Sequence, residues 1–323
     1  MMKAFLEMHY NIRDTYSTHI DNRSLLTDGE YVYLIIPVEN KEAMYMEQGA
    51  LSAFLHQNGY ELVSRLLPNR NGEWVTSHEG VSYMLMYASL PRVPQEHSHG
   101  RQLAHLHAAG ATQQFEPQHI SSFGQWKQVW MKKLDLYEGE IHRQASQNES
   151  AYMNLLLDSL PYIIGIGENA IQYVQETEGE WRTNEFDIGT VCFHRYTKQL
   201  RTSVIWSHEF VFDHGVRDLA EGIRFYWIRG KEEEALRLLY DYTEVRPLSI
   251  LAWRALYARL VMPLHVLDII GESFLAKDQE AYYYEKLNAL LAQQPDYEAR
   301  LGRFYEESGV DVHAINVPVI HWL

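Results

Sequence analysis

The chain has 323 residues and a formal net charge of −15, because 43 acidic side chains outnumber 28 basic ones. Hydrophobic residues make up 46% of the chain, so it can bury a sizeable core, and its length suits two domains or one domain with two lobes. The negative charge argues against an extended contact with a phosphate backbone, so we expect no nucleic-acid partner. The single cysteine, Cys192, excludes an internal disulfide and a cysteine-based zinc site.

The chain also lacks the patterns of secretion and membrane insertion. Residues 1–14 do not contain the long apolar run of a signal peptide. The most apolar stretch, residues 248–270, carries Arg254, Arg259 and His265, which a membrane span would have to bury in lipid. We therefore expect synthesis in the cytoplasm and no membrane span.

The first ninety residues predict a small sheet with one helix. Residues 30–38 (EYVYLIIPV) are rich in β-branched and aromatic side chains, and they follow Asp28-Gly29, a dipeptide that favours tight hairpin turns. This combination predicts a strand entered through a hairpin.

A helix and two more strands are predicted after that strand. Residues 42–56 place apolar side chains near helical spacing, and Gly59 closes the run. Two further apolar stretches, residues 61–67 and 81–88, are bounded by turn residues and predict antiparallel strands.

A proline pair predicts a boundary between two lobes. Pro91 and Pro94 stand among polar residues between the last predicted strand and the next helix. We therefore expect a hinge at about residues 88–96, with a lobe of residues 1–90 before it and a lobe of residues 91–323 after it.

The second lobe is predicted to be helical almost throughout. Pro161 suits the first turn of a helix, because its missing N–H needs no partner there. Residues 189–213 interrupt the helical spacing, Asp218-Leu219-Ala220-Glu221 opens the next helix as a capping-box pattern, and Pro263 should kink the last predicted helix. The helices predicted in this lobe are 100–107, 123–141, 161–175, one opening at 218, and 247–270.

Three short motifs, in this order, resemble the kinase-like fold of the aminoglycoside and choline phosphotransferases. Residues 100–107 (GRQLAHLH) are similar to that superfamily's G-x-x-L-A-x-L-H helix, residues 189–196 (GTVCFHRY) stand at its catalytic loop, and residues 217–220 (RDLA) match its Asp-Leu-Ala motif. The stretches FDHGVRDLAEGIR, VRPLSILAWRALYARLVMPLH, IGENAIQYV and VPVIHWL further resemble the spore-coat (CotS-like) branch, most closely the YutH-type spore coat-associated proteins.

The resemblance implies both a fold and a cellular setting. The fold would be an α+β, bilobal, protein-kinase-like architecture of the aminoglycoside phosphotransferase type, with a small antiparallel-sheet N-lobe and a large, mainly helical C-lobe. The implied location is the spore coat, and the implied partners are other spore coat proteins.

Phosphoryl transfer needs a phosphate cradle and a lysine on a strand of the first lobe, and neither has a signature here. The lysine position falls at Ile35 or Ile36, and Lys41, in the loop that follows, is expected to be a solvated surface residue. Glu47 stands where the family's ion-pairing glutamate would be. Without a lysine to meet, it is expected to be an exposed helical acid, although it stays a weak cofactor-binding candidate.

The catalytic loop is degraded in either alignment. If Cys192 anchors the loop, Phe193 replaces the histidine and Arg195 replaces the catalytic aspartate. If His194 anchors it, Tyr196 replaces the aspartate. Neither alignment supplies a proton acceptor, because a guanidinium has none to offer.

The positions expected for the magnesium ligands do not hold a clear set of oxygen donors. The metal-binding asparagine would fall at Leu200 or Arg201, and neither provides the oxygen that Mg²⁺ prefers. Counting back from the Asp-Leu-Ala motif places the metal-binding acid at Trp206, whereas a short deletion would place Glu209 or Asp213 there, so both carboxylates are weak candidates.

Two further features of this region have structural interpretations. Asp218 is assigned a structural role, because in kinase-like folds it braces the catalytic loop from behind. His208 and His214 lie close in sequence to the two candidate acids, but their spacing matches no established ligand motif, so no metal site is predicted.

These absences lead to one main interpretation and two alternatives. We expect a structural or binding component of the spore coat with a degenerate kinase-like fold, a pseudokinase without a cofactor. The alternative is an atypical ATP-dependent small-molecule phosphotransferase with displaced catalytic groups, which would use ATP and Mg²⁺. A third possibility is that the cleft between the lobes holds a ligand that is not a nucleotide.

Overall fold

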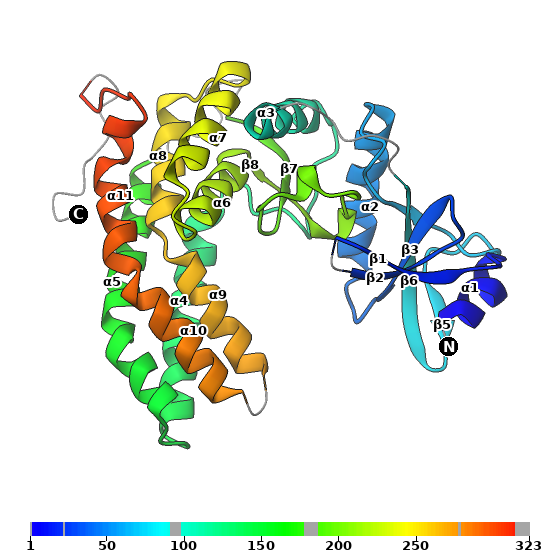
Figure 1. Ribbon diagram of the computed structural model, residues 1–323, viewed down its shortest axis with the longest axis horizontal. Coiled ribbons are helices and arrows are strands. Elements are labelled where there is room, and N and C mark those ends of the chain that lie inside the picture. The colour runs from blue at the N-terminus through cyan, green and yellow to red at the C-terminus, as the bar shows by residue number, and fades with distance from the viewer. Residues whose placement is uncertain (1, 22, 91–97, 178–186, 277–278, 314–323) are drawn as a thin grey trace. The chain divides into compact units, whose positions relative to one another are not determined.

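The computed structural model describes residues 2–21, 23–90, 98–177, 187–276 and 279–313 (Figure 1). Contacts divide the chain into two compact units. The sheet unit comprises Met1–Ser121 and Gly189–Gly215, and the helical unit comprises Ser122–Ile188 and Val216–Leu323. The hinge expected at residues 88–96 falls largely on residues 91–97, outside the described residues, so the boundary between the lobes stays a prediction.

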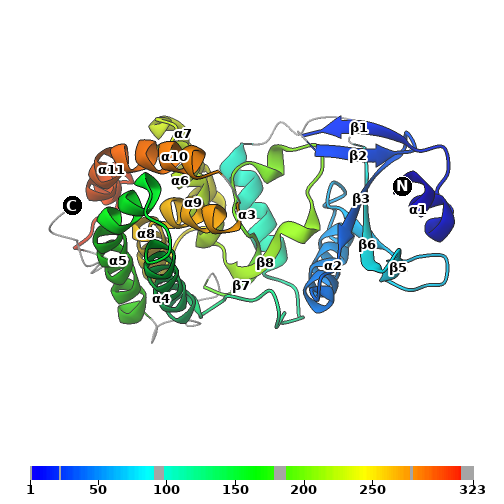
Figure 2. The same ribbon diagram turned by 90° about the horizontal axis from the view of Figure 1, so that it is seen from below.

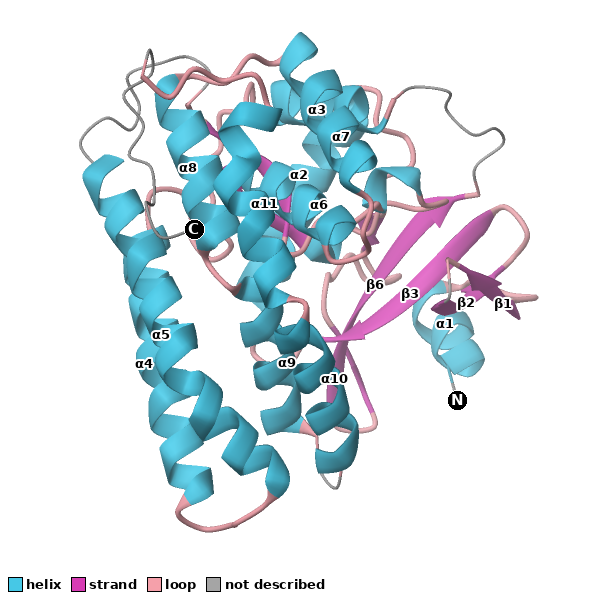
Figure 3. Ribbon diagram, turned by 60° about the vertical axis from the view of Figure 1, so that its left-hand side comes forward, coloured by secondary structure: helices cyan, strands magenta, loops and turns pink. Residues whose placement is uncertain are grey.

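The sheet unit is built on an antiparallel sheet of six strands (Figure 3). The order is β1-β2-β3-β6-β4, and β5 also pairs with β6. The two longest strands, β3 and β6, form the centre of the sheet, and all of β3 pairs with Tyr83–Ser89 of β6. The strands are β1 (Tyr16–Ile20), β2 (Arg23–Thr27), β3 (Tyr31–Pro37), β4 (Arg65–Leu67), β5 (Thr76–His78) and β6 (Val81–Ser89).

The predicted hairpin turn before β3 is confirmed. Gly29 has a φ of 97°, a left-handed conformation that favours glycine. The Asp28 carboxylate accepts the backbone N–H groups of Glu30 (3.0 Å) and Tyr31 (2.8 Å). It also accepts the hydroxyl of Tyr33 at 2.6 Å. The Asp-Gly pair therefore sets both the backbone conformation and the hydrogen bonds of the turn.

Two helices cover opposite faces of the sheet (Figure 2). Side chains along β3 alternate between the faces: Val32 and Ile36 enter one apolar cluster, and Tyr33 enters the other. Helix α1 (Met2–Tyr10) packs on the Tyr33 face through its buried residues. Helix α2 (Glu42–Gln57), as predicted, packs on the Ile36 face.

The expectation of one helix in the first ninety residues is wrong, because α1 precedes the sheet. Strands β1, β2 and β5 were also not predicted. Helix α1 has nine residues, too few to give a clear helical pattern. Most side chains of β1 are exposed and β5 has three residues, so neither shows a strong apolar alternation.

The sheet unit also contains one helix and a two-stranded sheet from later in the chain. Helix α3 (His99–Gly110) confirms the predicted helix, and strands β7 (Gly189–Phe193) and β8 (Phe210–His214) pair antiparallel. Gly110 lies against β7 so closely that a Cβ there would be 2.6 Å from Thr190 Oγ1. Thr190 Oγ1 donates to the carbonyl of His107 at 2.8 Å, so α3 and β7 are joined directly.

The helical unit contains most of the helices of the chain. Two of its predicted helices begin earlier than expected, one at residue 151 instead of 161 and one at residue 216 instead of 218. Pro161 lies inside α5 rather than at its start, because buried side chains in the preceding turns, such as Tyr152 and Leu156, stabilise helix there. The helices are α4 (Trp126–Ala145), α5 (Ala151–Thr177), α6 (Val216–Trp227), α7 (Glu232–Val245), α8 (Ile250–Val261), α9 (Leu264–Leu275), α10 (Glu280–Ala292) and α11 (Gln294–Glu307).

Two expectations about the later helices are also corrected. Helix α6 begins at Val216, so Asp218 lies in its first turn and not at the cap. A fully buried carboxylate there still faces the positive end of the helix dipole. Pro263 does more than kink one long helix, because it separates α8 from α9 at a bend of 46°.

In the part of the chain that the structure describes, no single helix is both long and apolar enough to cross a membrane. The bent pair α8 and α9 would meet those requirements only if the two helices were counted together.

A buried charge network joins α6 and α8 in the helical unit. The Glu221 carboxylate accepts from Arg224 at 2.8 Å and from Arg259 at 3.0 Å, and all three side chains are less than a tenth exposed. The Arg259 guanidinium also lies 4.8 Å from the ring centre of Trp126. Tyr297 receives a hydrogen bond from Arg224 (3.3 Å) and donates one to Leu260 O (2.8 Å), so α11 is tied to the same network.

Replacing Glu221 should destabilise the protein strongly. Glu221→Gln removes the charge shared by two buried arginines, and such a loss costs about 3–5 kcal/mol. Urea unfolding followed by circular dichroism measures the effect. Glu272→Gln, which removes the partner of Lys286 at an exposed ion pair, is the matched control and should change the free energy of unfolding much less. Equal effects of the two variants would contradict the importance of the network.

Candidate functional site

The aspartate position of the loop after β7 is filled by a buried phenol. Tyr196 has no exposed surface, and its hydroxyl lies 2.5 Å from Nε2 of His99, the first residue of α3. Its ring also packs on Phe193, with the ring centres 5.3 Å apart. Burial lowers the pKa of His99 to about 4, helped by the nearby charges of Arg201 and Lys198. A neutral imidazole and the Tyr196 hydroxyl therefore hold the loop against α3.

The other loop residues also make structural contacts. The Arg195 guanidinium donates to the carbonyl of His194 at 3.0 Å. Cys192 is fully buried, and its Sγ lies 3.7 Å from the carbonyl oxygen of Asp213 and 3.6 Å from that of His214. A thiol that is buried and directed at backbone carbonyls packs as a small apolar group.

One candidate position of the strand lysine and one candidate position of the metal-binding acid lie in the same apolar cluster. Ile36 on β3 and Trp206 are 7% and 5% exposed, and both belong to the core that includes Val32, Met84 and Met86. Ile35, the other lysine position, packs on the opposite face with α1. An active kinase would bring a cation and a carboxylate together around phosphates. Here, the candidate positions Ile36 and Trp206 hold apolar side chains that pack in one cluster.

Backbone hydrogen bonds hold the Trp206 segment onto the sheet unit. Ile205 N–H donates to Leu62 O at 2.9 Å, and Ser64 N–H donates to Ile205 O at 2.8 Å, which forms a short parallel pairing. The Ser207 N–H donates to Ser64 Oγ at 2.9 Å. Bonds on both sides of Trp206 therefore fix the depth at which its side chain enters the core.

The two candidate magnesium ligands of this region lie apart. Glu209 forms an ion pair with Arg23 on β2 and accepts from Gln199 Nε2 at 3.2 Å. Arg23 also lies 3.3 Å from His208 Nε2. Asp213 is fully buried near the end of β8, four residues further on, which is on the order of 10 Å along an extended strand. Arg23 thus already pairs with Glu209, and the Asp213 carboxylate accepts the backbone N–H of His214 at 2.8 Å.

Glu47 is not the exposed acid that the sequence predicted. Its side chain is 12% exposed and accepts the backbone N–H groups of Gln118 and His119 at 2.8 Å and of Ile120 at 3.1 Å. Nδ1 of His119 lies 2.9 Å from the same carboxylate. Burial by itself would raise the pKa of Glu47, but these hydrogen bonds together outweigh it and hold the pKa below its ordinary value. Glu47 is therefore an anchor for the segment that follows α3.

Sequence reasoning missed the partners that determine these roles. His99 precedes the recognised GRQLAHLH motif, and Arg23 lies in a strand that was not predicted. Each meets its partner across 97 or more positions of the chain, and no local pattern reports such a pairing.

Solved structures with the same architecture define the class of protein. An aminoglycoside phosphotransferase from Alicyclobacillus acidocaldarius superposes with a TM-score of 0.60 at 14% identity, covering 92% of this chain and 94% of that one. A microcompartment-associated aminopropanol kinase superposes with a TM-score of 0.59 at 14% identity, covering 96% and 99%. The fold is therefore the kinase-like fold of the aminoglycoside phosphotransferases, as predicted.

Sequence comparison identifies the family within that class. The family model "Spore coat putative kinase YutH" matches residues 3–304, and the chain belongs to this family. It is 30% identical to the endospore coat-associated protein YutH of Bacillus subtilis over 329 aligned residues, with 97% of each chain covered. It is also 23% identical to spore coat protein S of Bacillus subtilis over 197 residues, covering 58% of this chain and 56% of that protein.

The Trp206 side chain should make one of the largest contributions of any side chain to the stability of the sheet unit. Trp206→Ala removes a large buried group and leaves a cavity, a change that costs about 3–5 kcal/mol. Trp74→Ala is the matched control, because Trp74 in the same unit is 41% exposed and should change stability by about 0.5 kcal/mol or less. Denaturant unfolding of both variants checks this, and similar midpoints would show that Trp206 is not a core residue.

The Glu47 anchor should give a pH-dependent contribution to stability. Because its pKa is below the ordinary value of 4.5, the folded state favours the ionised carboxylate. The stabilisation is complete above pH 4.5 and is lost as the pH falls through the lower, folded-state pKa. The stability difference between wild type and Glu47→Gln should therefore shrink on acidification, as measured by urea unfolding from pH 7 to pH 3.

Glu42→Gln, an exposed position on the same helix, is the control for this series. A Glu47→Gln difference that stays constant with pH, or that Glu42→Gln reproduces, would contradict the anchoring role.

Proposed function

We propose that this chain is a non-catalytic, kinase-like component of the spore coat or of its assembly. The family and the two Bacillus subtilis relatives, which are named as coat proteins, support the coat setting. The partners in this proposal are other spore coat proteins. The proposal treats the fold as a scaffold for binding, since one fold serves many functions and the site must decide among them.

The packing of Trp206 with Ile36 carries the non-catalytic part of the proposal. Mg²⁺ requires oxygen ligands in near-octahedral geometry, and an indole supplies none. An isoleucine cannot neutralise phosphate charge. Both side chains are almost fully buried in one cluster, so a nucleotide would have to displace core packing in order to bind as it does in an active kinase.

The loop after β7 supports the same conclusion. A general base must have a free acceptor within hydrogen-bond reach of the substrate hydroxyl. The buried Tyr196 hydroxyl is engaged by His99, and the neighbouring Arg195 carries only donors. The degenerate loop thus has a structural role that accounts for its residues without any chemistry.

A small-molecule phosphotransferase with displaced groups is the alternative. The carboxylates of Glu209 and Asp213 favour it, because both are retained in the region where the family binds its metal. Under this alternative, ATP and Mg²⁺ are cofactors, and Glu209 must leave Arg23 before it can ligate an ion.

Magnesium-ATP should not stabilise the purified protein. A ligand that binds only the folded state raises stability by about 2.7 kcal/mol at a hundred times its dissociation constant, which a melting experiment detects easily. We expect no change in melting temperature with millimolar ATP and Mg²⁺, whereas the aminopropanol kinase, treated identically, should be stabilised.

Two variants separate the proposal from its alternative. Magnesium-dependent ATP turnover that is lost in Glu209→Gln or Asp213→Asn would establish the phosphotransferase and overturn the scaffold. Circular dichroism of each variant confirms that any loss of activity is not a loss of folding.

A further inference from the structure

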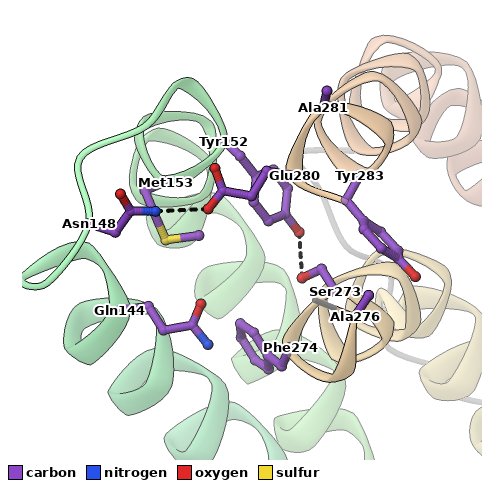
Figure 4. A pocket seen from close by; sticks show the side chains of 10 residues that line it. All are labelled: Gln144, Asn148, Tyr152, Met153, Ser273, Phe274, Ala276, Glu280, Ala281 and Tyr283. Carbon is purple, nitrogen blue, oxygen red and sulfur yellow. Dashed lines mark hydrogen bonds between the residues drawn. The ribbon is translucent and has the colours of Figure 1, made fainter. Parts of the chain in front are cut away.

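The helical unit contains a cavity of about 520 Å³ that the kinase-like site does not use (Figure 4). Its walls come from the end of α4, the start of α5, the end of α9 and the start of α10. All of the residues that line it belong to the helical unit. A cavity of this volume is in the range of sites for small organic ligands.

One wall of the cavity is held in place by contacts between protein groups. The Tyr152 hydroxyl donates to Ser273 Oγ at 2.7 Å, and Ser273 Oγ donates to Ile270 O at 2.7 Å, so both hydroxyls already have partners. The Phe274 ring meets the Tyr137 ring edge-on, with centres 5.5 Å apart. Gly271 allows this arrangement, because a Cβ there would collide with the Tyr137 hydroxyl. Phe274 is thus positioned at the cavity before any ligand enters.

The rim of the cavity has both hydrogen-bond donors and hydrogen-bond acceptors that remain available to a ligand. Asn148 Nδ2 donates to Glu280 Oε1 at 2.9 Å, and Gln144 Nε2 donates to Glu140 Oε1 at 2.7 Å. Each amide still has a carbonyl oxygen and a second N–H, and Glu280 has a second oxygen. In Figure 4, the side chains of Gln144, Asn148 and Glu280 surround the opening, and Phe274 lies at one edge.

The carboxylate and the amide groups at the rim favour a neutral ligand over a charged one. An anion would meet the Glu280 carboxylate, and no lysine or arginine lines the cavity among the described residues. An ammonium ion offers only donors, so it could use Glu280 but would leave the amide N–H groups unmatched. A hydroxyl group both donates and accepts, and several neighbouring hydroxyls match alternating carboxylate and amide groups.

We infer that this cavity binds a neutral saccharide of one to three rings. Ring hydroxyls of the sugar bond Gln144, Asn148 and Glu280, and its apolar C–H face packs on the Phe274 ring, whose face carries partial negative charge. This inference goes beyond the proposed scaffold role, because it gives the helical unit a ligand of its own. It does not depend on whether nucleotide binds.

Saturation-transfer difference NMR on the full chain tests the inference. The probes are cellobiose, maltotriose and N,N′-diacetylchitobiose, with spermidine and citrate as charged comparisons. We expect at least one saccharide to bind, and we expect neither charged probe to compete with it. Phe274→Ala and Glu280→Gln should each weaken saccharide binding about tenfold, since each removes one of the principal contacts.

Glu285→Gln is the matched control, because Glu285 is an exposed acid on α10 that does not line the cavity. It should bind as the wild type does, and circular dichroism checks that all variants are folded. The inference is overturned if no saccharide binds, if spermidine or citrate binds in place of the sugars, or if the Phe274 and Glu280 variants bind as well as the control.

Discussion

The short parallel pairing of Ile205 with residues 62–64 is the constraint on which the sheet unit depends. It fixes residues 204–207 against the sheet, so that the Trp206 indole must enter the core between the strands and α2. The side chain that this pairing places in the core is apolar, and Ile36 packs in the same cluster.

Three acidic side chains act as hydrogen-bond or ion-pair acceptors within the two units of this chain. Glu47 accepts three backbone N–H groups, Glu209 pairs with Arg23, and Glu221 joins two arginines in the helical unit. Burying a carboxylate is costly unless it is paired or hydrogen-bonded, so each of these contacts should stabilise the folded chain. The presence of an acidic residue is therefore weak evidence for catalysis, because structural and catalytic acids have the same residue type.

The fold and the family of this chain do not by themselves determine an activity. Solved phosphotransferases share the architecture at 14% identity, which is too distant to transfer chemistry. Tyr196 and Trp206, which stand at candidate positions of the reaction centre, are buried, and Glu209 is paired with Arg23. The helical unit also contains a cavity, and none of these residues lines it.

The sequence by itself determined the strong local elements and the class of fold. Local propensity, hydrophobic spacing and residue chemistry depend on residues that are close in the sequence. The sequence could therefore predict strand β3 with its Asp-Gly turn, helices α2 and α3, and the absence of a lysine on that strand. The nine-residue α1, the exposed β1 and the start of α5 before Pro161 could not. Their stability comes from packing against distant parts of the chain.

Only the tertiary structure decided what the candidate residues do. Gln118 helps to bury Glu47, His99 engages Tyr196, and the sheet surrounds Trp206. Each of these partners lies tens to more than a hundred positions away in the sequence. Burial and hydrogen bonding between such distant residues set the charge state and the accessibility of each group. Those properties belong to the folded chain, and no short stretch of sequence contains them.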